Sequence, residues 1–343
     1  MPDEPRNILV MLPNWVGDAV MFTPLLRQLR RQFPQAQMTL AGRAGPVAVL
    51  RPNPWTDKLL VAAALADLWR LRERGFDLAV LGPNSFRAAL GAWLAGARRR
   101  VGYGRNGRGL LLSEALQPPR QAKGEFAIVP AIDYYLGLGR ALGCQADDRR
   151  MELQIDPQDQ QRAGRLLEQA GFDPARPLAV LNPGGSYGTA KLYPAGRFAA
   201  VADGLADRLG FQIVINAGPG EQAIAQAIQQ AMGRPPLLDL AAVGNSLGLL
   251  KAIIARSSLV VTNDTGPRHI AAALGANLVT IFGPTDPGRT ELYYSRERIV
   301  RVDLPCSPCQ KKTCPLAEEK GRHRCMLAIS PEMVLAAAGE MGR

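Results

Sequence analysis

The sequence contains no apolar run approaching the roughly 20 residues that a membrane-spanning helix needs. Its first residues, MPDEPRNILVML, carry acids where a signal peptide carries basic side chains, and no cleavage site follows. Aromatic residues make up only 6% of the chain, hardly interleave with the arginine clusters, and belong to no recognisable nucleic-acid-binding module. These absences predict a cytoplasmic protein that does not act on nucleic acid.

Several signatures of nucleotide and metal sites are also missing. There is no GxxxxGKS phosphate loop and no DxD-type carboxylate pair at the end of an expected strand. The one GxGxxG match, GYGRNG at 102–107, follows no strand of normal length and precedes no proper amphipathic helix, so we treat it as chance. Because the carboxylate pair is missing, we expect no catalytic metal. We interpret residues 102–107, by their arginine and glycine content, as part of a mobile basic loop that contacts an anionic ligand.

The charge of the chain is unevenly distributed. Its 343 residues carry a net charge of +11 and suggest two domains. Residues 1–150 contain 21 Lys/Arg and 12 Asp/Glu, a balance of +9, whereas the remainder contains 20 and 18, a balance of +2. A basic first half indicates contact with a polyanion or an anionic membrane surface. A solvated arginine-rich face without a partner is the alternative.

Short apolar runs alternate with helical patterns along both halves, which predicts an α/β fold of two doubly wound domains facing a central cleft. The domains are expected at 1–155 and 156–330, and a C-terminal helix, 331–343, is expected to pack back on the first. Strands are expected at 7–13, 38–42, 59–62, 78–82, 178–181, 211–216, 237–241, 259–261 and 278–282. The expected helices include 64–74, 85–94, 125–142, 157–170, 222–232 and 246–256.

The clearest site signal lies in residues 258–283. An apolar strand ends in Asn263, Asp264 and Thr265, and a small-residue helix follows, with Pro267 and His269 in its first turn. Ligands of open α/β sheets bind at the carboxyl ends of strands, and a helix N-terminus there attracts anions. The segment is therefore either a diphosphate site or an ordinary capped turn.

Other strand ends carry further candidates. Asp18 follows the first strand and can be either a helix cap or a catalytic base. Asn84 repeats the pattern after the strand at 78–82. A glycine-rich loop ending in Lys191 has a phosphate-binding composition. Glu221 suits either a ribose contact or the electrostatics of a helix start.

Four segments together resemble one family, the ADP-heptose–lipopolysaccharide heptosyltransferases of the GT-B fold, over nearly the whole chain. The pattern is most similar to the heptosyltransferase II branch. The segments are NWVGDAV at 14–20, PNSF at 83–86, NPGG with AK within 182–191, and TNDTGPRHIAAALG at 262–275.

The resemblance implies an inverting glycosyltransferase that needs no cofactor for catalysis. Its partners would be an ADP-heptose donor and an anionic, lipid-linked inner-core acceptor at the cytoplasmic face of the inner membrane, which the protein would contact peripherally. It assigns catalysis to Asp18, as general base, and Lys191, on the leaving diphosphate. The implied donor-binding residues are Ser186, Lys191, Glu221, Asp264, Thr265, Gly266 and His269; the acceptor-binding ones are Asn14, Asn84, Arg100 and Arg105.

The sequence departs from the family pattern at Pro267 and Arg268, which stand between the glycine and the histidine of the last motif. Another GT-B nucleotide-sugar transferase, a nucleotide-sugar epimerase and a non-catalytic nucleic-acid binder are the alternatives. A preference for ADP over other nucleotides separates the first interpretation from these.

Five cysteines in a cytosolic chain argue against a disulfide framework. Four of them, Cys306, Cys309, Cys314 and Cys325, cluster near His323. Thiolates and an imidazole at such spacing can close a tetrahedral structural zinc site, although the spacing is not that of a standard zinc ribbon. Reduced thiols without a ligand and redox pairing are the alternatives, and Cys144 is expected in the core.

Overall fold

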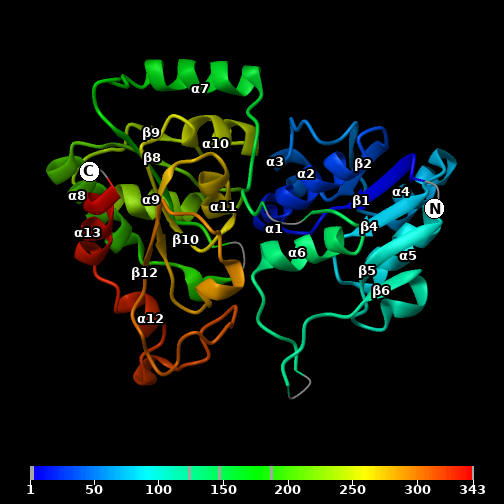
Figure 1. Cartoon of the computed structure of the whole chain (residues 1–343). Helices are drawn as coiled ribbons and strands as arrows, with labels where there is room; N and C mark the ends of the chain where they lie inside the picture. Colours follow the sequence, from blue (N-terminus) through cyan, green and yellow to red (C-terminus); the bar gives the residue numbers. More distant parts are fainter. Residues whose placement is uncertain (1–3, 123–124, 146–147, 186–187, 342–343) are drawn as a thin grey trace. The chain divides into compact units, whose positions relative to one another are not determined.

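The computed structural model of the protein describes residues 4–122, 125–145, 148–185 and 188–341 (Figure 1). The chain forms two compact units: residues 1–154 with 288–293, and residues 155–287 with 294–343. The division after Gln154 lies one residue before the predicted boundary, but the inclusion of 288–293 in the first unit was not predicted. No helix among the described residues is long and apolar enough to cross a bilayer.

The first unit is built on a six-stranded parallel sheet with the order β3-β2-β1-β4-β5-β6. Its strands are β1 (Asn7–Met11), β2 (Gln37–Gly42), β3 (Lys58–Val61), β4 (Leu78–Leu81), β5 (Arg99–Tyr103) and β6 (Glu114–Leu116). Met11 is level with both Ala41 and Leu81, so the carboxyl ends of the three central strands share one edge. Polar residues that follow these strands are thereby gathered at that edge.

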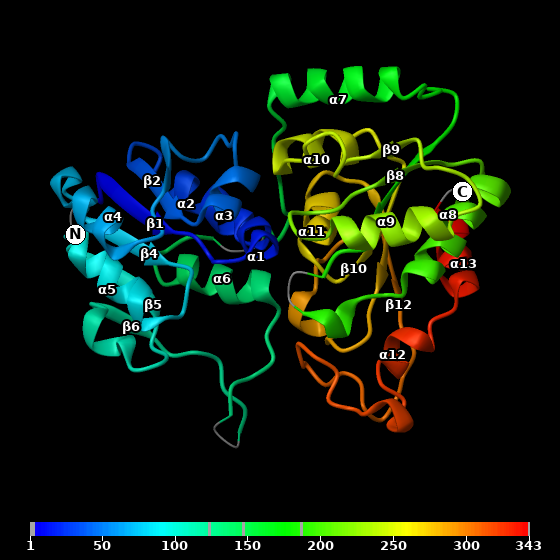
Figure 2. The same ribbon diagram turned by 180° about the vertical axis from the view of Figure 1, so that it is seen from behind.

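Helices cover both faces of this sheet. They are α1 (Val16–Met21), α2 (Thr23–Gln32), α3 (Ala44–Val49), α4 (Leu65–Arg70), η1 (Leu71–Arg74), α5 (Phe86–Leu94), η2 (Arg108–Leu111) and α6 (Ala131–Arg140). Because side chains of a strand alternate between faces, Leu9 and Met11 join one core with Leu68 and Ala89 of the packed pair α4 and α5. Helices α1, α2 and α6 pack together in a second layer (Figure 2).

The second unit repeats the architecture with the strand order β12-β11-β10-β7-β8-β9, again all parallel. Its strands are β7 (Leu178–Asn182), β8 (Gln212–Ile215), β9 (Leu238–Asp239), β10 (Leu259–Asn263), β11 (Asn277–Ile281) and β12 (Glu297–Val300). Thr262 is level with Asn182, so β7 and β10 end side by side. The chain order reverses between these two strands, which is where doubly wound sheets bind ligands.

Among the described residues, seven α-helices and three short 3₁₀ helices accompany this sheet. The α-helices are α7 (Pro157–Gln169), α8 (Ala195–Leu209), α9 (Gln222–Ala231), α10 (Leu247–Ile254), α11 (Gly266–Ala273), α12 (Arg324–Leu327) and α13 (Pro331–Met341). The 3₁₀ helices are η3 (Thr189–Lys191), η4 (Pro287–Thr290) and η5 (Glu318–Lys320). Residues of α8, α9 and α13 share one apolar core with the sheet. Helices α10 and α11 pack together, and α7 packs on α10. The predicted fold class, two doubly wound α/β domains, is confirmed.

Three expectations about the elements were wrong. The helix expected at 125–142 begins only at Ala131, because Pro130 stands at its N-cap and the preceding segment pairs Phe126 with Arg120. Residues 99–103 form the strand β5, so GYGRNG at 102–107 begins within the last two residues of a strand that was not expected. The C-terminal helix packs on α8, β11 and β12 of the second unit, where Leu335 is buried in the apolar core.

Candidate functional site

The turn between β10 and α11 gathers the strongest candidates of the second unit. Asn263 is the last residue of the fully buried strand β10, Asp264 and Thr265 follow it, and Thr265 is the N-cap residue of α11 with extended backbone. The Thr265 side chain does not cap the helix; its hydroxyl instead accepts a hydrogen bond from Asn182 Nδ2 at 3.0 Å. Pro267 has no N–H, and the Arg268 N–H donates to the Thr265 carbonyl oxygen at 3.1 Å, so the Gly266 N–H is the donor that the first helical residues can offer to an anion.

Lys191 and Asp264 form a buried ion pair at this turn. Lys191 Nζ donates to Asp264 Oδ2 at 2.7 Å and to the Asp264 backbone oxygen at 2.8 Å. Thr285 Oγ1 donates to the same carboxylate oxygen at 2.8 Å. Desolvation, the largest influence, raises the pKa of Asp264, but attraction to Lys191 and Arg268 outweighs it and lowers the pKa below its usual value.

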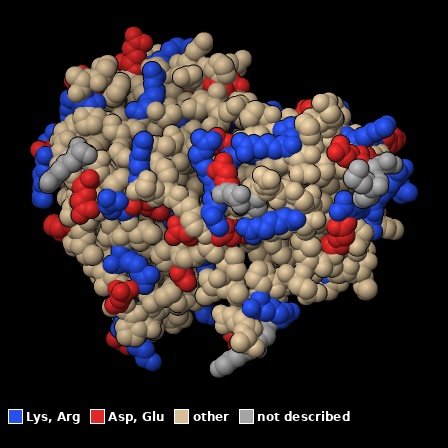
Figure 3. Space-filling view, viewed as in Figure 1, with Lys and Arg blue, Asp and Glu red and all other residues tan. Residues whose placement is uncertain are grey.

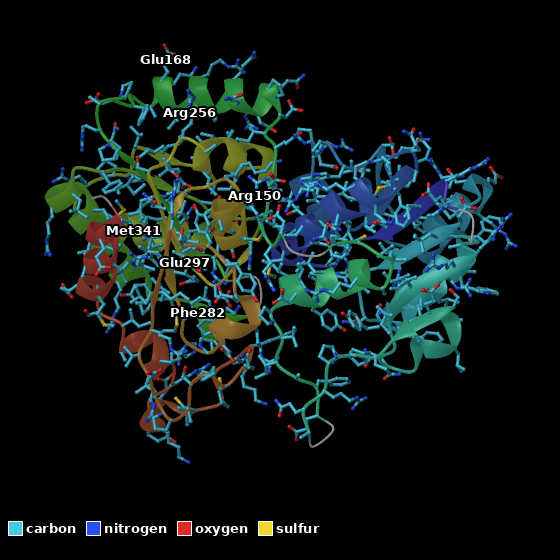
Figure 4. The ribbon with its side chains drawn as sticks, in the orientation of Figure 1. Arg150, Glu168, Arg256, Phe282, Glu297 and Met341 are labelled. Atoms are coloured by element: carbon cyan, nitrogen blue, oxygen red, sulfur yellow. The ribbon has the colours of Figure 1, made fainter. Side chains whose placement is uncertain are left out.

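Arg268, in the first turn of α11, is completely buried. Its Nε and Nη2 donate to the two carboxylate oxygens of Glu297 in β12, at 2.6 and 2.9 Å. Its guanidinium also lies 4.8 Å from the centre of the Phe282 ring; Phe282 and Glu297 are labelled in Figure 4. The departure from the family pattern at this position is thus compensated by a bidentate partner, since an unpaired buried charge is strongly unfavourable.

His269 lies beside these charges as a neutral imidazole. Burial above all, and then the neighbouring Arg268, lowers the pKa of His269 to about 3. Its Nδ1 atom is buried and has no hydrogen-bond partner among the described residues. With this lowered pKa, His269 does not add a positive charge at neutral pH.

A chain of asparagine side chains joins the strand ends around the ion pair, and sequence reasoning missed it. Asn216 after β8 donates to Asn182 Oδ1, and Asn245 Nδ2 donates to Asn216 Oδ1 at 2.7 Å. Asn263 Nδ2 donates to the Pro183 and Gly184 carbonyl oxygens at 2.8 and 3.1 Å. These bonds fix the backbone of the glycine-rich loop against β10.

Glu221 ties two loops together. Its carboxylate accepts from the backbone N–H groups of Gly185 and Gly218, each at 2.9 Å. A side chain at Gly184 would collide with this carboxylate, since a Cβ there would lie 2.4 Å from Glu221 Oε2. Glu221 therefore shapes the loop at 184–185. Ser186, the next candidate, lies outside the described residues.

In the first unit, Asp18 lies half-buried in the first turn of α1. The Tyr135 hydroxyl, from α6, donates to Asp18 Oδ1 at 3.1 Å. Burial, and then the charge of Asp18, raise the pKa of Tyr135 well above 10, so Tyr135 stays protonated and remains a donor. One oxygen of the Asp18 carboxylate is thus held in place by a neutral donor.

Asn84, at the end of β4, forms a second polar centre of this unit. Its Oδ1 accepts from Arg108 Nη2 at 3.1 Å and from the Tyr134 hydroxyl at 3.2 Å. Arg108 is fully buried, and this burial lowers its pKa to about 10. The role of Arg108 was not foreseen because exposed and buried arginines look alike in a sequence.

The other acceptor-binding candidates differ from one another. Arg100 donates to the carbonyl oxygens of Leu111 and Ala97 at 2.7 and 2.6 Å, so its guanidinium stabilises the β5–β6 connection. Arg105 stacks on the Phe126 ring, with its guanidinium carbon 3.9 Å from the ring centre. Asn14 is exposed in the loop after β1.

All five cysteines are free thiols, and Cys144 and Cys325 are buried. Burial, followed by the nearby Cys306, Cys309 and Cys314 thiols, raises the pKa of Cys325. Within the described ranges, no three His, Cys, Asp or Glu side chains form a group that could hold a metal ion. The structural-zinc alternative therefore receives no support from the geometry.

Comparison with known proteins gives consistent results. Residues 66–320 match the sequence model of the family described as "Glycosyltransferase family 9 (heptosyltransferase)". Lipooligosaccharide heptosyltransferase 2 of Haemophilus influenzae is 28% identical over 353 residues, covering 98% of this chain and 99% of the relative. Lipopolysaccharide heptosyltransferase 2 of Escherichia coli K12 is 28% identical over 346 residues, covering 96% of each chain.

Solved structures show the same likeness. ADP-heptose lipopolysaccharide heptosyltransferase II of E. coli has a TM-score of 0.80 at 25% identity and covers 98% of both chains. A family 9 glycosyl transferase of Veillonella parvula has a TM-score of 0.83 at 23% identity, covering 98% of this chain and 97% of the other. Since the family match at residues 66–320 extends over well more than half of the chain, this protein belongs to glycosyltransferase family 9, the heptosyltransferases.

Proposed function

We propose that this protein transfers heptose from ADP-heptose to the inner core of lipopolysaccharide, with inversion at the anomeric carbon. The observation that carries the proposal is the turn between β10 and α11, where an uncapped helix start lies beside the Lys191–Asp264 pair. This arrangement suits a diphosphate. The E. coli and H. influenzae relatives, named heptosyltransferase 2 and aligned over nearly their whole length, support the choice of sugar and acceptor.

Donor binding is assigned to the second unit. The Gly266 backbone N–H at the start of α11 and the Lys191 ammonium would hold the diphosphate as negative charge develops on it. In the structure the cations Lys191 and Arg268 pair with the carboxylates Asp264 and Glu297, so these four side chains together add no net charge. Binding of the diphosphate therefore depends on hydrogen-bond donors that point toward it and not on an excess of positive charge. Asp264 and the chain of asparagine side chains hold these donors in place.

Acceptor activation is assigned to Asp18. Its carboxylate takes the proton from the acceptor hydroxyl, whose oxygen forms the new bond to the anomeric carbon while the bond to ADP breaks. Tyr135 keeps one carboxylate oxygen oriented through its 3.1 Å hydrogen bond. Asn14, Asn84 and Arg105 are proposed to contact the acceptor; Arg100 contributes through the β5–β6 connection instead.

No cofactor is proposed for the transfer, because protein donors supply the stabilisation that a divalent ion gives in other transferases. We further propose peripheral contact with the cytoplasmic face of the inner membrane, where a lipid-linked acceptor would be reached. Treatment with EDTA should leave kcat unchanged; loss of activity that Mg²⁺ or Mn²⁺ restores would contradict the cofactor-free mechanism.

The decisive experiment is a product assay with ADP-heptose and a series of truncated inner-core acceptors, analysed by mass spectrometry. We expect addition of one heptose to an acceptor that already carries the first. Thermal-shift measurements should show stabilisation by ADP that exceeds stabilisation by UDP or GDP. An equal response to all three, with no heptose transferred, would favour a different nucleotide-sugar enzyme.

A further inference from the structure

The outward face of α5 is apolar. Its inward face consists of small buried residues, among them Ala88, Ala89 and Ala92, which let the helix approach the sheet closely. On the outward side, Phe86 is 50% exposed and Trp93 52% exposed, with the half-buried Leu90 between them. Positions i, i+4 and i+7 share one face of a helix. A surface helix ordinarily presents polar side chains there.

Neighbouring elements extend this apolar surface. Helix α4 packs along α5 and contributes Trp69, which is 58% exposed. The short helix η2 packs on α5 from the same unit and contributes Leu110, which is 97% exposed. Scattered exposed apolar residues are normal, but large ones on three adjoining elements indicate an interaction site. We call Trp69, Phe86, Leu90, Trp93 and Leu110 the docking face.

The surroundings of the docking face are basic. Residues 65–111 contain nine arginines and three acids, Asp67, Glu73 and Asp77, which gives a balance of +6. Arg87 and Arg98 are exposed, within and just after α5. The Arg72 side chain lies against Gly96, just beyond the C-terminal end of this helix. Figure 3 shows Lys and Arg side chains on the visible face of the first unit.

We propose that the docking face inserts its aromatic and leucine side chains into the headgroup region of an anionic bilayer, with the surrounding arginines on the lipid phosphates. Tryptophan favours the membrane interface, and each arginine near an anionic surface adds attraction. A symmetric dimer through this face is disfavoured, because it would bring the exposed arginines around two copies of the face, among them Arg87 and Arg98, close together. The proposal deepens the peripheral membrane contact of the proposed function and rests on it for its biological purpose.

The test is co-sedimentation of the full-length protein with vesicles of phosphatidylethanolamine and phosphatidylglycerol, compared with phosphatidylcholine alone. We expect binding to the anionic vesicles that falls as salt rises. The double variant Trp69→Ser/Trp93→Ser should weaken it about tenfold or more, since each removes half-exposed apolar surface available for insertion. Arg87→Glu/Arg98→Glu should weaken it by at least about thirtyfold at low salt, because each arginine lost removes about 1 kcal/mol and each new carboxylate adds repulsion.

Leu327→Ser is the matched control, because Leu327 is also exposed, at 45%, but lies on α12 of the second unit. It should bind vesicles like the unchanged protein. Equal binding by the tryptophan variant would overturn the proposal. So would light scattering that shows a dimer which the tryptophan variant abolishes, since the face would then join two copies.

Two further measurements separate this proposal from the proposed function. Circular dichroism and Tm check that the variants are folded. Transfer to a delipidated core acceptor needs no membrane, so the tryptophan variant should perform it at the rate of the unchanged protein. If the unchanged protein binds vesicles but transfers no heptose, the docking face stands and the proposed function fails.

Discussion

Lys191 Nζ lies 2.7 Å from Asp264 Oδ2 and 2.8 Å from the Asp264 backbone oxygen. This pair connects the loop after β7 with the turn after β10, 73 residues further along the chain. Because the ammonium contacts a backbone atom as well as the carboxylate, its position depends on the turn itself. This buried charge pair therefore holds the two loops of the proposed donor site together, along with the asparagine hydrogen bonds between them.

Breaking this pair should destabilise the protein strongly. Asp264→Asn leaves the buried charges of Lys191 and Arg268 without their shared partner, and loss of one member of a buried pair costs about 3–5 kcal/mol. Urea unfolding measures the free energy of unfolding. Asp303→Asn is the control, since its pair with Arg301 is surface-exposed, and it should cost less than about 1 kcal/mol. Similar losses in both variants would contradict this account.

The buried His269 should make stability depend on pH. Its pKa is about 3 in the folded protein and ordinarily 6.5, so between pH 3 and 6.5 the imidazole is protonated in the unfolded chain but neutral in the folded one. Stability is therefore full above pH 6.5 and falls as the pH drops toward 3, by up to about 1.4 kcal/mol per pH unit. Chemical unfolding between pH 7 and about pH 4.5, above the titration range of most carboxyl groups, measures this slope.

The histidine variants identify the source of that slope. His269→Gln should flatten it, whatever its effect on stability at pH 7, because glutamine does not titrate. His323→Gln replaces the only other histidine and should leave the slope in place. An unchanged slope in the His269 variant would assign the effect to another group.

Substitution of Asp18 should slow the transfer step and leave nucleotide binding unchanged. In the Asp18→Asn variant the amide cannot take the proton from the hydroxyl of the acceptor sugar, so kcat should fall by about 10²–10⁴-fold while the Kd of ADP stays unchanged. Tyr135→Phe removes only the hydrogen bond to Oδ1, so we expect a fall in kcat of about tenfold or less. Steady-state kinetics and calorimetry with ADP test both. A normal kcat in the Asp18 variant would remove this residue from the role of base.

Glu221 should affect donor binding through the loop at residues 184–185, whose backbone it holds in place. Glu221→Gln replaces one acceptor oxygen by an amide that cannot accept from a backbone N–H, so one of the contacts to Gly185 and Gly218 is lost. We expect the KM of the donor to rise by about fivefold to tenfold, with kcat little changed. Glu168→Gln, an exposed glutamate of α7, should leave the donor KM unchanged. If the Glu221 variant shows a normal KM, the loop does not depend on this carboxylate.

Sequence reasoning located much of the fold and the centre of the site. The apolar runs 259–261 and 178–181 are buried on both faces of a parallel sheet, so their hydrophobicity is continuous and easy to recognise. It was less reliable where a strand is polar, as in β5, whose first two residues are arginines. It failed at residues 125–130, where a helical pattern was followed in spite of Pro130.

By itself the sequence determined the class of fold, the family and the strand-end positions of Asp18, Lys191, Asp264 and His269, because local periodicity and short motifs encode these. Only the tertiary structure decided their partners: Tyr135 for Asp18, Asp264 for Lys191, and Glu297 for Arg268. Tyr135 is 117 residues from Asp18, and Glu297 is 29 residues from Arg268. Which polar side chains are buried against each other depends on how the strands and helices pack, and the local sequence does not specify that packing.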